Sequence, residues 1–67
     1  MNNVHFNVYG LQNTQMKTQL KNVLKGLDGV RNVNVDLGRG SVEVKYNEPT
    51  DVKEIRQGIE QIGCKIR

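Results

Sequence analysis

The chain has 67 residues, a formal charge of +3 and no tryptophan. A chain of this length buries only about 60% of its unfolded surface, so residues 1–67 have room for one domain with a small core of Val, Ile and Leu. No apolar run is long enough to cross a membrane and no segment is typical of a secretory leader, which argues against membrane insertion and favours a cytoplasmic protein. The single cysteine, Cys64, excludes an internal disulfide. The modest positive charge does not indicate a nucleic-acid-binding protein.

The first half of the chain predicts a strand followed by an amphipathic helix. Apolar residues alternate with polar ones, as in a strand with one buried face, at Val4, Phe6 and Val8. Gly10 releases the chain from this strand, and either Asn13 or Thr14 can cap the helix that follows. Apolar residues then recur at spacings of three and four, at Met16, Leu20, Val23, Leu24 and Leu27. We expect Gly29 to end the helix in a left-handed turn.

The second half predicts a hairpin, a helix and a short last strand. Two alternating runs, residues 33–37 and 42–46, are joined by the short turn 38–40, which favours a β-hairpin. Asp51 followed by Glu54 resembles a capping box. The helix behind it has an apolar side made of Val52, Ile55, Ile59 and Ile62. Gly58 within this helix costs roughly 1 kcal/mol relative to Ala, and Gly63 closes it before the tail 64–67.

The order strand, helix, strand, strand, helix, strand consists of two similar halves. Two such halves interlock as an α+β, ferredoxin-like βαββαβ sandwich. We therefore predict a four-stranded antiparallel sheet with two helices on one face and water on the other. The predicted core consists of Phe6, Leu20, Leu24, Val35, Val44 and Ile59.

Four segments resemble one known family. These are Val4 to Leu11, Leu27 to Val30, Val33 to Leu37 and Ile59 to Gly63. They look like the heavy-metal-associated (HMA) domains of copper chaperones and copper-transporting P-type ATPases. The resemblance covers nearly the whole chain and implies the same fold and a role in heavy-metal binding and transport.

The chain departs from this family in its metal loop, whose usual motif is Gly-Met-x-Cys-x-x-Cys. The corresponding residues are Gly10, Leu11, Gln12, Asn13, Thr14, Gln15 and Met16. Asn13 stands for the first cysteine of the motif and Met16 for the second, while Leu11 is expected to plug the core beneath the loop. Two thiolates at the head of a helix suit the soft Cu(I) ion. The resemblance thus implies an HMA-like domain with a degenerate metal loop.

A residual metal site is one alternative. Cys64 follows the last glycine loop, where chaperones of this family often carry a tyrosine beside the metal loop. Cys64 and Met16 could therefore bind Cu(I) or another soft metal ion at low affinity, with a further ligand from a partner or a second copy. In that arrangement the positive helix end would favour the Cys64 thiolate. The interpretation that we favour is that Met16 fills the first helical turn and that Cys64 is a small buried apolar residue.

A row of lysines is the other candidate surface. Lys17, Lys21 and Lys25 share one side of the first helix, which by default is a solvated face. In the related chaperones a basic first helix docks onto an acidic partner domain, so the resemblance implies an acidic HMA-type domain of a metal-transporting ATPase as the partner. The chain itself is expected to be a monomer or a weak dimer.

Other functions find little support. The open sheet face carries Ser41, Glu43 and Lys45 on one strand, which offer no aromatic platform for stacking RNA bases. His5 is expected on that same face, away from the loop, as a solvated residue. No catalytic triad, carboxylate pair or phosphate-cradling loop can be assembled, which argues against an enzyme. We predict a docking or regulatory module related to metal transport, with the low-affinity metal carrier as the alternative.

Overall fold

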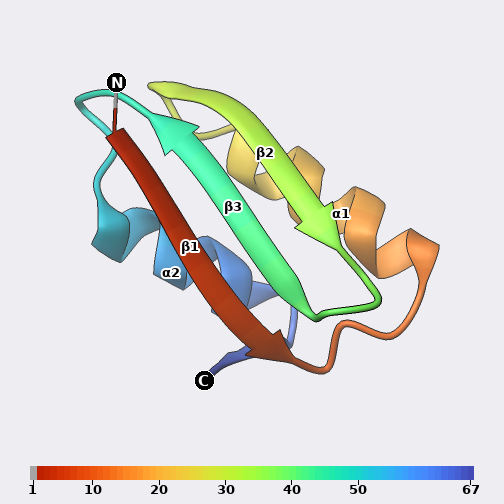
Figure 1. Ribbon diagram of the computed structural model, residues 1–67. Helices are drawn as coiled ribbons and strands as arrows, with labels where there is room; N and C mark the ends of the chain where they lie inside the picture. The colour runs from red at the N-terminus through yellow and green to blue at the C-terminus, as the bar shows by residue number, and fades with distance from the viewer. Residues whose placement is uncertain (1) are drawn as a thin grey trace.

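The computed structural model describes residues 2–67 as a four-stranded sheet covered on one face by two helices (Figure 1). The elements are β1 (Asn2–Tyr9), α1 (Thr14–Lys25), β2 (Val30–Asp36), β3 (Ser41–Tyr46), α2 (Val52–Gln61) and β4 (Lys65–Ile66). The strand order is β2-β3-β1-β4, with antiparallel pairing between all neighbours. The predicted ferredoxin-like fold is confirmed. Within residues 2–67, no helix is both long enough and apolar enough to cross a membrane.

The strand register places the apolar residues of the three long strands on the helix side. β1 pairs with β3 without interruption from Asn2 opposite Tyr46 to Asn7 opposite Ser41. β2 pairs with β3 in the predicted hairpin, with an irregularity between Val30 and Asn32. The predicted alternation is confirmed, and the buried strand residues are Phe6, Val8, Val33, Val35, Val42, Val44 and Tyr46.

The core lies between this face of the sheet and the two helices. All six predicted core residues are buried, and Ile55, Val42 and Cys64 join them. Burying an aliphatic side chain of this size contributes about 1.5–3 kcal/mol, so a few such residues carry most of the stability of a small domain.

The first helix ends earlier than the sequence predicts. Its last residue is Lys25, and Gly26 caps it with right-handed dihedral angles while its N–H donates to the Asn22 carbonyl. The expected left-handed stop at Gly29 is therefore wrong. The spacing of apolar residues predicted a longer helix because Leu27, which lies beyond the helix, also packs against the core.

Gly29 has another role, which is to bring two loops into contact. Its φ of +101° is in the left-handed region, and its carbonyl accepts a hydrogen bond of 2.8 Å from the Asn47 N–H. A Cβ atom at Gly29 would overlap the Asn47 carbonyl oxygen. The buried Thr50 hydroxyl also donates to the Asp28 carbonyl. We call these contacts the loop clamp, because they join the α1–β2 loop to the β3–α2 loop.

The second helix begins as predicted. The Asp51 carboxylate caps it by accepting a hydrogen bond of 2.9 Å from the Glu54 N–H. Ile55 and Ile59 are fully buried and Ile62 is half-buried, whereas Val52 is 37% exposed and does not belong to the buried side. Val52 is the first residue of the helix, where the chain is still approaching the core.

Gly58 is buried where the two helices cross. A Cβ atom there would lie 3.0 Å from Leu24 Cδ2 and 3.4 Å from Val23 Cγ1. The intrinsic cost of glycine in a helix is thus offset by a close helix–helix approach that a side chain would obstruct.

Candidate metal loop and its surroundings

The loop of residues 10–16 connects β1 to α1 at the end of the sheet where β4 pairs with β1 (Figure 1). Gly10 lies against the segment that follows α2. A Cβ atom at Gly10 would be 3.5 Å from the Gly63 carbonyl oxygen and 3.8 Å from Cys64 Cα. The structure therefore brings the backbone of Cys64 beside the start of the predicted metal loop.

Asn13 has a clear structural role in this loop. Its backbone is extended and its Oδ1 atom accepts a hydrogen bond of 2.9 Å from the Met16 N–H. Such an N-cap satisfies an amide that would otherwise lack a partner, and it stabilises a helix by typically about 1 kcal/mol. The amide oxygen of Asn13 is therefore already engaged by the helix end.

The two apolar residues of the loop turn toward the protein. Leu11 and Met16 are half-buried and pack against the core, which confirms the core-plugging position expected for Leu11. The polar residues between them, Gln12, Thr14 and Gln15, are exposed. The outer surface of the loop consequently presents amide and hydroxyl groups.

Cys64 lies in the hydrophobic core and not at the loop surface. Its side chain is 1% exposed, and burial raises the pKa of the Cys64 thiol above its ordinary value of 9.0. Desolvation of the charged form thus opposes the thiolate that the predicted metal site would need. At neutral pH this residue is a neutral thiol among apolar neighbours.

Lysine recurs at every fourth residue of α1, at positions 17, 21 and 25, and we call these three residues the basic strip. Lys17 and Lys21 are half-buried and Lys25 is exposed in the last turn. The helix contains no Asp or Glu, so its charge is not balanced along its own length. A lysine at the C-terminal turn also interacts favourably with the helix dipole.

A pair that the sequence reasoning missed lies on the open side of the same end. Tyr9 is 55% exposed, and the Arg67 guanidinium carbon lies 4.6 Å from the centre of its ring. The pairing of Tyr9 with Lys65 in the sheet creates this contact. Only the strand register could have predicted it, since the two residues are at opposite ends of the sequence.

The other ionisable residues that the structure describes form no further metal-binding cluster. Among residues 2–67, no group of three or more His, Cys, Asp and Glu side chains is placed to hold a metal ion. His5 is exposed on the open face opposite Glu43, as expected, and Glu43 also accepts a hydrogen bond of 3.3 Å from Asn3.

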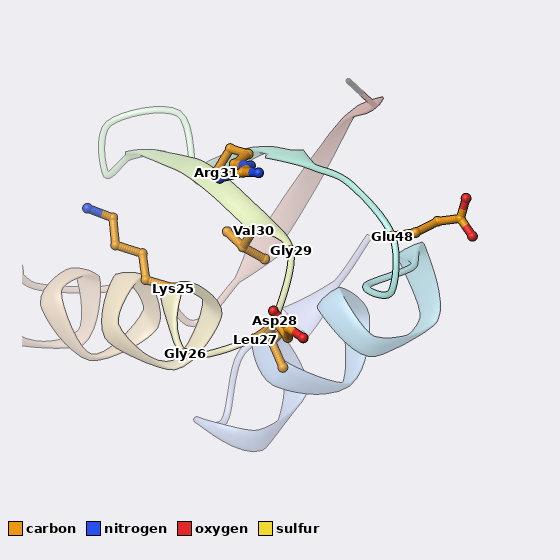
Figure 2. A pocket seen from close by; sticks show the side chains of 8 residues that line it. All are labelled: Lys25, Gly26, Leu27, Asp28, Gly29, Val30, Arg31 and Glu48. Atoms are coloured by element: carbon orange, nitrogen blue, oxygen red, sulfur yellow. The ribbon is translucent and has the colours of Figure 1, made fainter.

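A surface hollow of about 500 Å³ lies at the far end of the domain, beside the loop clamp (Figure 2). Its lining consists of Lys25, Gly26, Leu27, Asp28, Gly29, Val30, Arg31 and Glu48. Figure 2 shows the Lys25 and Glu48 side chains extending outward on opposite sides of the hollow. The charged side chains that line the hollow do not point toward a common centre, so they form no candidate binding site there.

Comparisons with known proteins agree with this architecture. The family model for the heavy-metal-associated domain matches residues 6–65. The CopZ metallochaperone is 27% identical with a TM-score of 0.94 over 98% of this chain and 100% of its own. The CsoZ metallochaperone is 26% identical with a TM-score of 0.95 over 98% and 96% of the two chains.

A copper binding domain from HMA7, a P-type ATPase, is 20% identical to this chain, with a TM-score of 0.90. The superposition covers 100% of this chain and 95% of that domain. At this identity the likeness shows the fold alone. No curated protein matches the chain. The family match extends over nearly all of the sequence and the metallochaperone structures superpose over 98% of it, so this chain belongs to the heavy-metal-associated domain family.

Proposed function

We propose that this chain is a non-enzymatic docking or regulatory module of heavy-metal transport, which binds an acidic HMA-type domain of a metal-transporting ATPase. The docking surface is the loop of residues 10–16 together with the basic strip Lys17, Lys21 and Lys25. One observation carries the proposal: the single thiol of the chain, Cys64, is 1% exposed and is held as a neutral core residue.

The donor atoms of the loop support a role without high-affinity metal transfer. Cu(I) prefers sulfur ligands, and a carrier needs thiolates that a partner can reach. At the two positions that we align with the family's cysteines, Asn13 offers a hard amide oxygen that already caps α1, and Met16 offers one half-buried thioether. This set does not fit a tightly held soft ion.

The basic strip supports docking because its charge is concentrated on one element. Complementary charge steers association and selects partners, and its contribution weakens as salt increases. The analogy with related chaperones, whose basic first helix docks onto an acidic partner domain, supports an acidic HMA-type domain as the partner type. In this proposal the chain would compete with metal-loaded chaperones for that surface.

The test is an NMR titration of the labelled chain with a metal-free ATPase HMA domain of net negative charge. We expect shifts confined to residues 10–25 and an affinity that falls with salt. Each exposed ion pair is worth up to about 1 kcal/mol, so Lys17→Glu combined with Lys21→Glu should weaken binding by about tenfold. The control is the pair Lys53→Glu and Arg56→Glu, which applies the same charge change to exposed positions of α2. Equal weakening by both pairs, or no binding at all, would reject the proposal.

The second candidate function is low-affinity binding of Cu(I) through Cys64 and Met16. The observation in its favour is the closeness of the two backbones, since a Cβ atom at Gly10 would lie 3.8 Å from Cys64 Cα. Its test is the amount of Cu(I) that remains with the chain after desalting, together with the rate at which iodoacetamide labels Cys64. Retention of one ion per chain, with protection of Cys64 that Met16→Leu removes, would replace the docking module by this carrier. The docking proposal predicts neither retention nor protection.

A further inference from the structure

Three side chains form a cluster on the open face of the sheet, at the end that carries residues 10–16. Tyr9 is 55% exposed, and Lys65 lies directly opposite it on β4. The guanidinium carbon of Arg67 lies 4.6 Å from the centre of the Tyr9 ring. Both basic residues are exposed, and neither β1 nor β4 carries an Asp or Glu that would balance their charge. We call these three residues the open-face cluster.

The backbone fixes the position of this cluster. Tyr9 and Lys65 are paired across β1 and β4, and the Arg67 N–H donates a hydrogen bond of 2.8 Å to the Asn7 carbonyl. Ile66, between the two basic residues, is half-buried against the core. The backbone of the cluster therefore has little freedom left to lose when a ligand binds, which lowers the cost of association.

The contact between Arg67 and Tyr9 prepares the guanidinium group for a carboxylate. The attraction between a guanidinium group and an aromatic ring is electrostatic and does not use up the N–H donors of the arginine. These donors form a rigid fork that fits the two oxygen atoms of a carboxylate. Tyr and Arg are also among the residue types that contribute most to binding at protein interfaces.

The open-face cluster adjoins the loop of the proposed docking surface. Tyr9 directly precedes Gly10, the first residue of the loop. A Cβ atom at Gly10 would lie 3.8 Å from Cys64 Cα, and Lys65 is the next residue along the chain. In Figure 1 the C-terminal segment lies beside the tip of the β1 arrow, where the loop begins. A partner that covers the loop reaches the cluster by extending around the end of the sheet.

Charge selects the occupant of this cluster. Its two basic side chains favour a partner that presents carboxylates. A second copy of the chain, which also has a charge of +3, would bring the same basic cluster to a symmetric contact and would be repelled. A continuation of the chain would lead away from the loop, because β4 runs from Tyr9 toward Asn7.

The opposite end of the domain offers no comparable attraction for an acidic partner. The hollow there is lined by two basic and two acidic side chains, which are Lys25, Arg31, Asp28 and Glu48. Their charges cancel, so the excess positive charge favours the end of the sheet that carries the loop.

We infer that the docking surface continues from the loop onto the open-face cluster, where Arg67 binds a carboxylate of the acidic partner domain. Tyr9 positions the guanidinium group, and Lys65 adds positive charge beside it. This inference rests on the proposed docking function and goes beyond it. It adds a contact outside residues 10–25, on the sheet side of the domain, which the docking function by itself does not require.

The test extends the NMR titration with the metal-free, acidic ATPase HMA domain. We expect the amides of Tyr9, Lys65 and Arg67 to shift together with residues 10–25. Arg67→Gln should weaken binding by about fivefold, the most that one exposed ion pair typically contributes. The matched control is Lys45→Gln, which makes the same charge change at an exposed position of the same face, near the other end of the sheet. We expect this control to change the affinity by less than about twofold.

Shifts at the open-face cluster, with weakening by Arg67→Gln and not by Lys45→Gln, would support the inference. Shifts confined to residues 10–25, or an affinity of Arg67→Gln equal to that of the wild type, would overturn it and leave the docking function intact. Equal weakening by both variants would also overturn it, because net charge alone would then explain the effect.

Two further outcomes concern the partner itself. No binding of the ATPase domain by the wild type would reject the docking function, and the inference with it. If the amides of the open-face cluster shift when the chain alone is concentrated, its occupant is a second copy of the chain, and the assignment of an acidic partner is wrong.

Discussion

Cys64 differs from the cysteines of a metal carrier in the direction of its pKa shift. Burial raises its pKa above 9.0. The folded chain then holds the thiol proton more tightly than the unfolded chain. The stability that the protonated thiol contributes is complete below the ordinary thiol pKa and is lost as the pH rises through the folded pKa. We expect the free energy of unfolding, measured with urea, to fall more steeply between about pH 8 and pH 10 for the wild type than for Cys64→Ala. Parallel pH profiles would show that the thiol titrates in the same way in both states.

Substitutions in the loop can test the predicted alignment of Asn13 and Met16 with the family's ligand positions. If Asn13 and Met16 occupy the family's ligand positions, Asn13→Cys with Met16→Cys should raise Cu(I) affinity by several orders of magnitude without changing the fold. Removal of the Asn13 cap should cost about 1 kcal/mol of stability. Competition with a coloured Cu(I) chelator measures the affinity, and the single variant Asn13→Cys is the control. A folded, reduced double variant that binds no better than the wild type would refute the alignment of these positions.

At the scale of elements, the sequence correctly predicted the features that depend only on neighbouring residues. The caps at Asn13 and Asp51, the strand alternation and the hairpin follow from neighbouring residues, and the structure confirms them. The end of α1 was mispredicted because Leu27 continues the apolar spacing beyond the cap at Gly26. The exposure of Val52 was mispredicted because this residue lies at the very start of α2. The 1% exposure of Cys64 agrees with the favoured interpretation of this residue as a small apolar one.

Gly58 gives a prediction at this scale, where helix propensity and packing oppose each other. Gly58→Ala should gain roughly 1 kcal/mol of helix propensity. Its methyl group would lie 3.0 Å from Cδ2 of the fully buried Leu24, and overpacking typically costs about 1–3 kcal/mol. We therefore expect a net loss of up to about 2 kcal/mol in chemical denaturation. Leu24→Val removes the obstructing atom, so Gly58→Ala should be better tolerated in that background. A stabilised single variant would show that the helices separate easily.

For the whole molecule, the small core makes stability sensitive to single truncations. At roughly 0.05–0.15 kcal/mol per residue, a domain of this size has a total stability of about 3–10 kcal/mol. Leu24 is completely buried, and Leu→Ala changes in cores cost about 2–5 kcal/mol. Leu24→Ala should therefore unfold a large part of the population at room temperature. The measurement is a thermal melt followed by circular dichroism, and a cooperative transition near that of the wild type would contradict the core assignment.

The loop clamp has a consequence for how the sequence can vary. Gly29 and Gly63 both have a positive φ, but a Cβ atom at Gly29 would overlap the Asn47 carbonyl, whereas nothing lies within 4 Å of one at Gly63. Asparagine tolerates the left-handed region better than most residues, so Gly63→Asn should remain viable. In a saturation library sorted for folded protein, we expect position 63 to retain asparagine and position 29 to lose every substitution. The two glycines have similar backbone angles but would differ in the substitutions that survive. At position 63 only the backbone angle limits the choice of residue, whereas at position 29 contact with the neighbouring loop excludes every side chain.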